Sequence, residues 1–104
     1  MGSSLEVKEG GIHKQGTGEK VPYSVTTTRW GSSPGSSAVV AYDLADWADV
    51  TTTLFPTNTP TESGDKISLS LCQAVTKGHT YRIEVYFKIG TAEYETHFFV
   101  EAVR

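Results

Sequence analysis

The residue types that perform most catalytic and metal chemistry are scarce in this chain and lie far apart. The histidines are His13, His79 and His97, and the one cysteine is Cys72. No pair among them has a zinc-ligand spacing, and no nucleophile motif surrounds the cysteine or any serine. A zinc centre or a catalytic triad would need residues from separate strands to converge. The pattern favours a non-enzymatic protein that uses no cofactor.

Carboxylates gather in the middle of the chain, where no Lys or Arg separates Arg29 from Lys66. The acidic residues of this stretch are Asp43, Asp46, Asp49, Glu62 and Asp65. The first three are spaced three residues apart, whereas a helix-loop-helix Ca²⁺ loop spaces its ligands by two and has Gly at its sixth position. The spacing favours turn caps that also protect a sheet edge. The alternative is a weak Ca²⁺ site among Asp43, Asp46, Asp49 and Asp65.

The elements that position these residues are strands. Thr80–Ile89 alternates apolar and polar side chains, Gly90-Thr91 is suited to a type II′ turn, and a second strand runs over 92–103. With a two-residue turn, the numbers of facing residues sum to 181. This register pairs Lys88 with Glu93 and Glu84 with His97 on the outer side, and Phe87 with Tyr94 and Ile83 with Phe98 on the inner side. Both faces therefore agree on one hairpin.

Further strands are expected at intervals along the chain. Their ranges are Leu5–Lys8, Val21–Thr28, Ser37–Tyr42, Asp49–Phe55 and Asp65–Leu71. The total of about seven antiparallel strands, separated by Gly, Pro, Ser and Thr, is typical of an all-β sandwich. We expect one domain over 19–104 and a flexible Gly-rich arm over 1–18, with 1–4 as a candidate tag remnant.

Four aromatic residues are candidates for contacts with a partner or for a lid on the core. Tyr86 and Phe99 fall on the polar side of the hairpin, where we expect them to share a patch with Arg82. Trp47 falls in a loop and could stack on a sugar or anchor a protein. Trp30 ends a strand, and we expect it to cover the core.

The segment before the long strand places Val75 six residues and Gly78 three residues ahead of Tyr81. This spacing resembles the tyrosine corner of fibronectin type III and immunoglobulin-like sandwiches, with Lys77 in place of the usual Pro. In such a corner the tyrosine hydroxyl bonds an upstream backbone group and Gly lets the chain bend.

A wider resemblance covers the chain from Ile12 onward. The order and spacing of turn, aromatic and terminal residues resemble small immunoglobulin-like proteins encoded in the head and tail gene clusters of tailed phages and prophages. The matching residues are Lys14, Gly18, Glu19, Tyr23, Trp30, Gly78, Tyr81, Gly90, Phe98, Val103 and Arg104. The resemblance implies a virion-associated or assembly protein, located in the virion or in the bacterial cytoplasm before assembly. The longer Thr-rich middle resembles equally a bacterial surface module.

Composition limits the partners. The 104 residues carry a net charge of −3 and are 38% apolar, with no basic cluster for nucleic acid and no membrane-length apolar run. We therefore expect a protein partner, including a second copy, and neither nucleic acid nor membrane. The alternative is a cell-surface module that binds carbohydrate or protein through loop aromatics such as Trp47.

Overall fold

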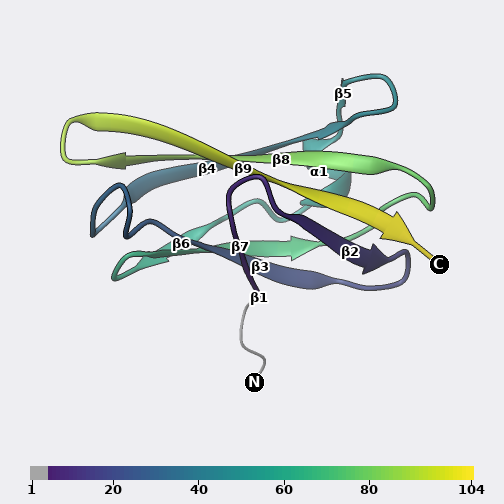
Figure 1. Ribbon diagram of the computed structural model, residues 1–104, viewed down its shortest axis with the longest axis horizontal. Helices are drawn as coiled ribbons and strands as arrows, with labels where there is room; N and C mark the ends of the chain where they lie inside the picture. The colour runs from purple at the N-terminus through teal and green to yellow at the C-terminus, as the bar shows by residue number, and fades with distance from the viewer. Residues whose placement is uncertain (1–4) are drawn as a thin grey trace.

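Two β-sheets stacked face to face make up the computed structural model, which describes residues 5–104 (Figure 1). The four-stranded sheet has the order β1 (Leu5–Val7), β3 (Val21–Thr26), β7 (Lys66–Cys72) and β6 (Thr61–Ser63). The five-stranded sheet has the order β2 (Ile12–Gly16), β9 (Ala92–Val103), β8 (Thr80–Ile89), β4 (Gly35–Asp43) and β5 (Ala48–Asp49). The only helix within 5–104 is α1 (Thr51–Leu54).

This strand order is that of an immunoglobulin-like β-sandwich, so the expected fold class is confirmed. The part of the chain that the structure describes holds nine strands rather than about seven. Both sheets are mixed, because β1 runs parallel to β3 and β2 runs parallel to β9. The proposed tag remnant at 1–4 lies outside the described residues.

The hairpin of β8 and β9 has the register that the sequence predicts. Lys88 pairs with Glu93, Glu84 with His97, and the inner residues Phe87 and Ile83 pair as expected. Gly90 has a φ of 63°, which a residue at the first central position of a type II′ turn needs. The match of charge pairs on the outer side with apolar pairs on the inner side was therefore sufficient to predict this register.

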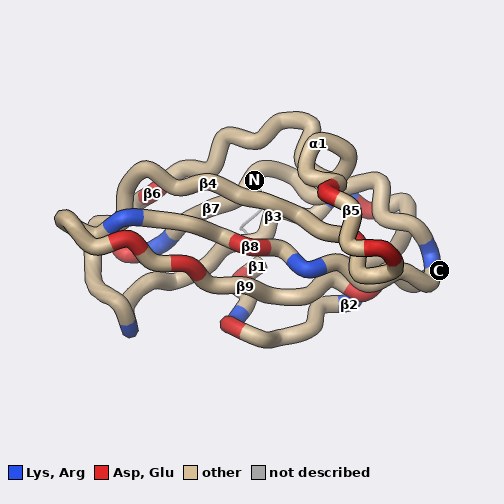
Figure 2. Tube along the Cα trace, turned by 90° about the horizontal axis from the view of Figure 1, so that it is seen from above, with Lys and Arg blue, Asp and Glu red and all other residues tan. Residues whose placement is uncertain are grey.

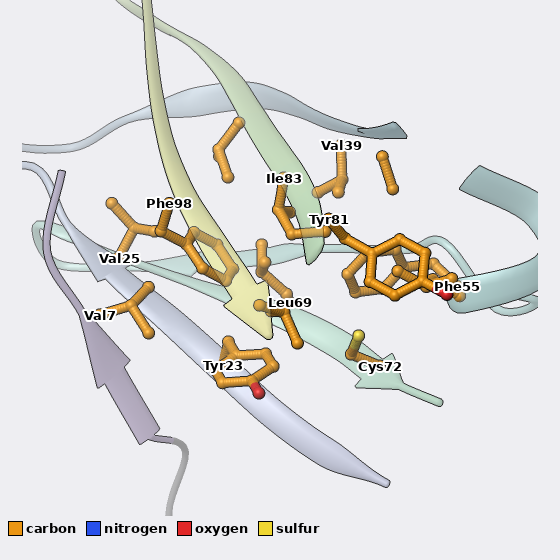
Figure 3. Close-up of a cluster of buried hydrophobic side chains, with 14 of the residues drawn as sticks. Val7, Tyr23, Val25, Val39, Phe55, Leu69, Cys72, Tyr81, Ile83 and Phe98 are labelled. Carbon is orange, nitrogen blue, oxygen red and sulfur yellow. The ribbon is translucent and has the colours of Figure 1, made fainter. Parts of the chain in front are cut away.

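The core lies between the two sheets and contains side chains from both. Figure 3 shows Tyr23 and Val25 of β3 across from Phe98 of β9 and Ile83 of β8. All four are buried, as strand alternation predicts for an inner face. Trp30 packs edge-on against Phe87 with ring centroids 5.5 Å apart, so it lies against the core as expected.

The first part of the chain differs from the expected flexible arm. Leu5–Val7 pairs with β3, and Ile12–Gly16 pairs with β9. Gln15 is fully buried; its amide donates hydrogen bonds to the carbonyls of Glu19 and Cys72, 3.0 and 2.9 Å away, and its carbonyl accepts one from the Tyr23 hydroxyl. These bonds satisfy a buried polar side chain and hold β2 against the core.

Two further predictions need correction. The expected strand over Asp49–Phe55 is instead the end of β5 followed by α1, because the Asp49 carboxylate accepts a hydrogen bond from the Thr51 N–H and turns the chain. Strict alternation along the expected strand Asp65–Leu71 places Leu71 on the same side as Ile67 and Leu69, but Leu71 is 47% exposed. The register of β7 against β3 shifts between Pro22 and Ser24, which moves the inward side to Cys72.

The geometry of a tyrosine corner is present before β8. The Tyr81 hydroxyl accepts a hydrogen bond of 2.8 Å from the Thr76 N–H, and Val75 is buried. Gly78 has a φ of 86°, which a side chain would disfavour, and its N–H donates to the Ala102 carbonyl. The corner thus ties the approach to β8 to the end of β9 without the usual Pro.

Candidate functional site

The candidate site is the side of the five-stranded sheet that faces away from the core, called here the outer face. Figure 2 looks down on this sheet and shows β4, β8 and β9 side by side, with charged positions along β8 and β9 and few on β4. The central rows of the outer face are formed by Ile12, Ala38, Val40, Tyr42, Arg82, Glu84, Tyr86, Glu95, His97 and Phe99. Charged residues lie toward its two ends, namely Lys14, Lys88, Glu93 and Glu101. Six of the ten central residues are apolar or aromatic, which is unusual for the middle of a solvated sheet face.

One row of the outer face crosses four strands. Ile12 of β2 pairs with Phe99 of β9, Phe99 pairs with Arg82 of β8, and Arg82 pairs with Tyr42 of β4. Side chains that are direct partners across strands lie in contact distance on one face. Ile12 is 67% exposed, while Phe99 and Tyr42 are half-buried. The row is therefore a partly exposed apolar strip with one arginine in it.

Trp47 lies beside the end of this row. Its ring centroid is 6.1 Å from that of Tyr42, and its side chain is 60% exposed. The loop that carries it connects β4 to β5 and rises above the layer of β8 and β9 (Figure 1). Trp47 has a φ of 58°, an uncommon backbone conformation for a bulky residue, held by the hydrogen bond from its N–H to the Asp43 carbonyl.

Glu84 holds the charged centre of the outer face together. Its carboxylate accepts a hydrogen bond of 2.8 Å from Arg82 Nε and another from the Tyr86 hydroxyl. Burial acts to raise the pKa of Glu84, but the bonds from Tyr86 and Arg82 outweigh it and the pKa is lowered. The same bond to Glu84, with partial burial, raises the pKa of Tyr86 to about 12. Arg82 thus reaches the surface with its charge already balanced.

The structure changes the predicted patch in one respect. Tyr86 pairs with Glu95 and Phe99 pairs with Arg82, so the pair Glu84 and His97 stands between the two aromatic residues. Tyr86 and Phe99 share a face but are not diagonal neighbours. Strand positions four residues apart are about 13 Å apart, beyond the reach of a diagonal contact.

The sequence did not identify Ile12, Val40 and Tyr42 as members of the site. Ile12 was assigned to the arm. Val40 and Tyr42 gave a signal, because Ser37–Tyr42 is apolar without alternation and therefore has an apolar side chain on both faces. Only the order of the strands shows that these residues join Phe99 and Arg82.

The acidic stretch forms turn caps. Asp43, Asp46 and Asp49 each accept a hydrogen bond from the N–H two residues ahead, at 3.0, 3.1 and 2.9 Å. Asp65 lies elsewhere, bonded to the Thr28 hydroxyl. Within residues 5–104 no three His, Cys, Asp or Glu side chains gather where they could hold a metal ion. A Ca²⁺ site among the four aspartates therefore has no geometric support.

The three histidines lie in separate places. His13 packs edge-on against Tyr23, His97 packs edge-on against Phe99, and His79 Nδ1 lies 2.7 Å from Asp43 Oδ2. Cys72 is buried in the core, and this burial raises the pKa of its thiol to about 12. Such a thiol is almost entirely protonated at neutral pH and a poor nucleophile.

The fold and the outer face define a class of protein: an immunoglobulin-like β-sandwich with an apolar strip on its five-stranded sheet. No family model, curated protein or solved structure matches the chain. Over residues 5–104, no helix has both the length and the apolar character needed to cross a membrane.

Proposed function

We propose that this protein is a non-enzymatic structural or interaction module that associates with protein through the outer face. The observation that supports this most directly is the row of Ile12, Phe99, Arg82 and Tyr42 across four strands. Aromatic residues and Arg are enriched in the centres of protein interfaces, and contiguous exposed apolar patches mark such sites. The first partner we propose is a second copy of the chain.

The charges on the outer face favour its use as a protein interface. An interface excludes water, and an unpaired charge that enters it is costly. Arg82 already has a carboxylate partner in Glu84, whose remaining oxygen accepts the Tyr86 hydroxyl. The central charges can therefore enter an interface as a neutral unit, with the apolar strip beside them.

The edge of β4 that β5 does not cover is poorly suited to binding another strand. At this side of the sheet, the outer face is therefore the surface available to a partner. Ser37 N–H donates to the Glu62 carboxylate, the Val39 carbonyl accepts from Asn58, and Ala41 N–H donates to the Thr51 hydroxyl. Side chains thus occupy backbone groups that would pair with an incoming strand, a common protection of sheet edges.

The role we favour is that of a minor virion or assembly protein of a phage or prophage. The resemblance in the order of turn and aromatic residues supports this role. An assembly protein must associate with copies of itself or with a larger shell, and the outer face offers a surface for either.

The test is a pair of matched variants compared by sedimentation velocity. Phe99→Ser with Tyr42→Ser removes the aromatic part of the strip, and we expect self-association to weaken by about a hundredfold, since two central aromatic contacts are lost. Leu71→Ser, on the other sheet, is the control, because Leu71 is an exposed apolar residue that lies outside the outer face. Association as strong in the double variant as in the wild type would show that the face is not the contact. A loss in Leu71→Ser as large as in the double variant would show the same.

A second candidate function is carbohydrate binding, which the exposed Trp47 beside Tyr42 favours. Exposed aromatic rings stack on sugar faces. The test is quenching of tryptophan fluorescence by oligosaccharides. Quenching that disappears in Trp47→Phe would support this function, because Trp30 is packed against Phe87 and would not report it.

A further inference from the structure

The hairpin half of β9 has an open edge. β2 pairs with β9 only at Phe99–Val103. Just before β2, the Gly10 N–H donates a hydrogen bond to the His97 carbonyl. Beside Ala92–Thr96 the described chain has β8 on one side and no strand on the other. The chain before β2 leaves this sheet and forms β1 in the other one. Five residues of β9 therefore form an unpaired edge.

The backbone groups of this edge point outward. In an antiparallel ladder, alternate residues direct their N–H and C=O away from the partner strand. On β9 the His97 carbonyl accepts from Gly10, and the Phe99 N–H donates to the Gly11 carbonyl, both on the side of β2. Glu93 and Glu95 are in the same phase, so their N–H and C=O groups face the open side.

A cavity of about 170 Å³ lies between the sheets on this side. Its wall combines the apolar side chains of Val7, Val25 and Trp30 with charged residues of 6–9 and Arg29, and Thr96 belongs to the edge itself. Thr96 is 2% exposed, and its hydroxyl has no hydrogen-bond partner among the described residues. A cavity of about 150 Å³ can hold a molecule as large as benzene. An aliphatic side chain from a strand placed beside β9 would point into this space, because strand side chains alternate between the faces.

The charges on the edge select the partner. Glu93 and Glu95 are exposed on the outer side of the open edge, and neither takes part in an ion pair within residues 5–104. Two copies joined by this edge would bring these carboxylates together, and like charges across a ladder are destabilising. A strand with Lys or Arg at alternate positions would be attracted instead.

We propose that the edge Ala92–Thr96 of β9 binds an extended segment of another protein in which basic residues alternate with aliphatic ones. The segment continues the line of β2, bonds the backbone of Glu93 and Glu95, and places aliphatic side chains beside Thr96. Main-chain bonds of this kind provide affinity, and alternate side chains provide specificity. The proposal adds a second contact to the proposed interaction function and does not require the outer face.

The probe is a blocked heptapeptide with the sequence Lys-Val-Lys-Val-Lys-Val-Lys, titrated into the whole chain and followed by amide NMR. We expect the amides of Glu93, Glu95 and His97 to shift, and their hydrogen exchange to slow by about tenfold at saturation. A peptide with Glu in place of Lys should leave these amides unchanged. Binding of the Lys peptide should weaken as salt is raised, because exposed charges are screened.

Variants separate the backbone contribution from the charge. Glu95→Pro removes an N–H that faces the open edge and leaves the bonds to β8 in place; we expect binding about tenfold weaker. Glu95→Gln keeps the N–H and should cost about threefold. Glu101→Gln is the matched control, since Glu101 is on the same strand and side but pairs with Lys14 of β2, and it should leave binding unchanged.

Charge reversal keeps the test decisive if Glu95→Pro fails to fold. Glu93→Lys with Glu95→Lys should lose the Lys peptide and bind the Glu peptide. The proposal is overturned if the Lys peptide binds this variant as well as the wild type, or if it leaves the three amides unprotected. Phe99→Ser with Tyr42→Ser should still bind the peptide, so failure of the outer face and failure of the edge give different results.

Discussion

At the scale of single residues, Tyr81 closes the corner before β8 with one hydrogen bond. Its hydroxyl accepts the N–H of Thr76, a backbone group that the turn leaves without another partner in 5–104. The sequence could predict this contact, because a tyrosine at a strand start after a Gly bend has an upstream backbone group within reach. The replacement of Pro by Lys77 did not prevent it.

We expect Tyr81→Phe to lower the free energy of unfolding by about 1.5 kcal/mol, since a partly buried N–H loses its acceptor. The measurement is urea unfolding followed by fluorescence. Tyr94→Phe is the control, because no hydrogen bond of the Tyr94 hydroxyl is present in 5–104. Equal stabilities of Tyr81→Phe and Tyr94→Phe would contradict the account of the corner.

Asp43 links the loop of Trp47 to the corner through His79. Burial acts to raise the pKa of Asp43, but hydrogen bonds from the Ala45 N–H and from His79 outweigh it, and the pKa falls below its ordinary value of 3.8. A carboxyl whose pKa is lower in the folded state stabilises the fold above its unfolded pKa and loses that contribution as the pH falls.

We therefore expect stability to decline as the pH drops below about 4, and Asp43→Asn to make this decline shallower. Urea midpoints measured from pH 7 to pH 2.5 provide the comparison. An acid decline of the same steepness in the wild type and in Asp43→Asn would mean that the carboxylate is not held as described.

At the scale of elements, the sequence predicted the β8 and β9 hairpin in full and missed β2. The hairpin of β8 and β9 was predicted with its register, because charge pairs outside and aromatic pairs inside required the same alignment. β2 was missed, because Ile12–Gly16 has a polar residue, Gln15, at its most buried position and Gly at its end. A buried polar residue has no hydrophobic signal, and only its partners in the fold explain it.

We expect Gln15→Leu to destabilise the protein by about 2 to 3 kcal/mol despite the added apolar surface. The Tyr23 hydroxyl and the Cys72 carbonyl would each lose a buried hydrogen-bond partner. Urea unfolding measures the loss, and exchange of the β2 amides shows whether this strand opens first. A variant as stable as the wild type would mean that the buried network does not hold β2 in place.

At the scale of the whole molecule, the outer face exists only when four strands are aligned. Tyr86, Phe99, Arg82 and Trp47 were predicted as contact residues from one hairpin and one loop, and the structure places all four on or beside this face. Their grouping could not be predicted, since it depends on β4 lying beside β8 and on β2 lying beside β9. The strand order therefore added Tyr42 and Ile12 and separated Tyr86 from Phe99.

The central claim is that this face joins one copy of the chain to another. The measurement that tests it most directly is molar mass by light scattering over about a hundredfold range of concentration. We predict a mass that rises from the 11.3 kDa of the single chain toward a defined multiple of it. A mass that stays at 11.3 kDa over the whole range would contradict the claim.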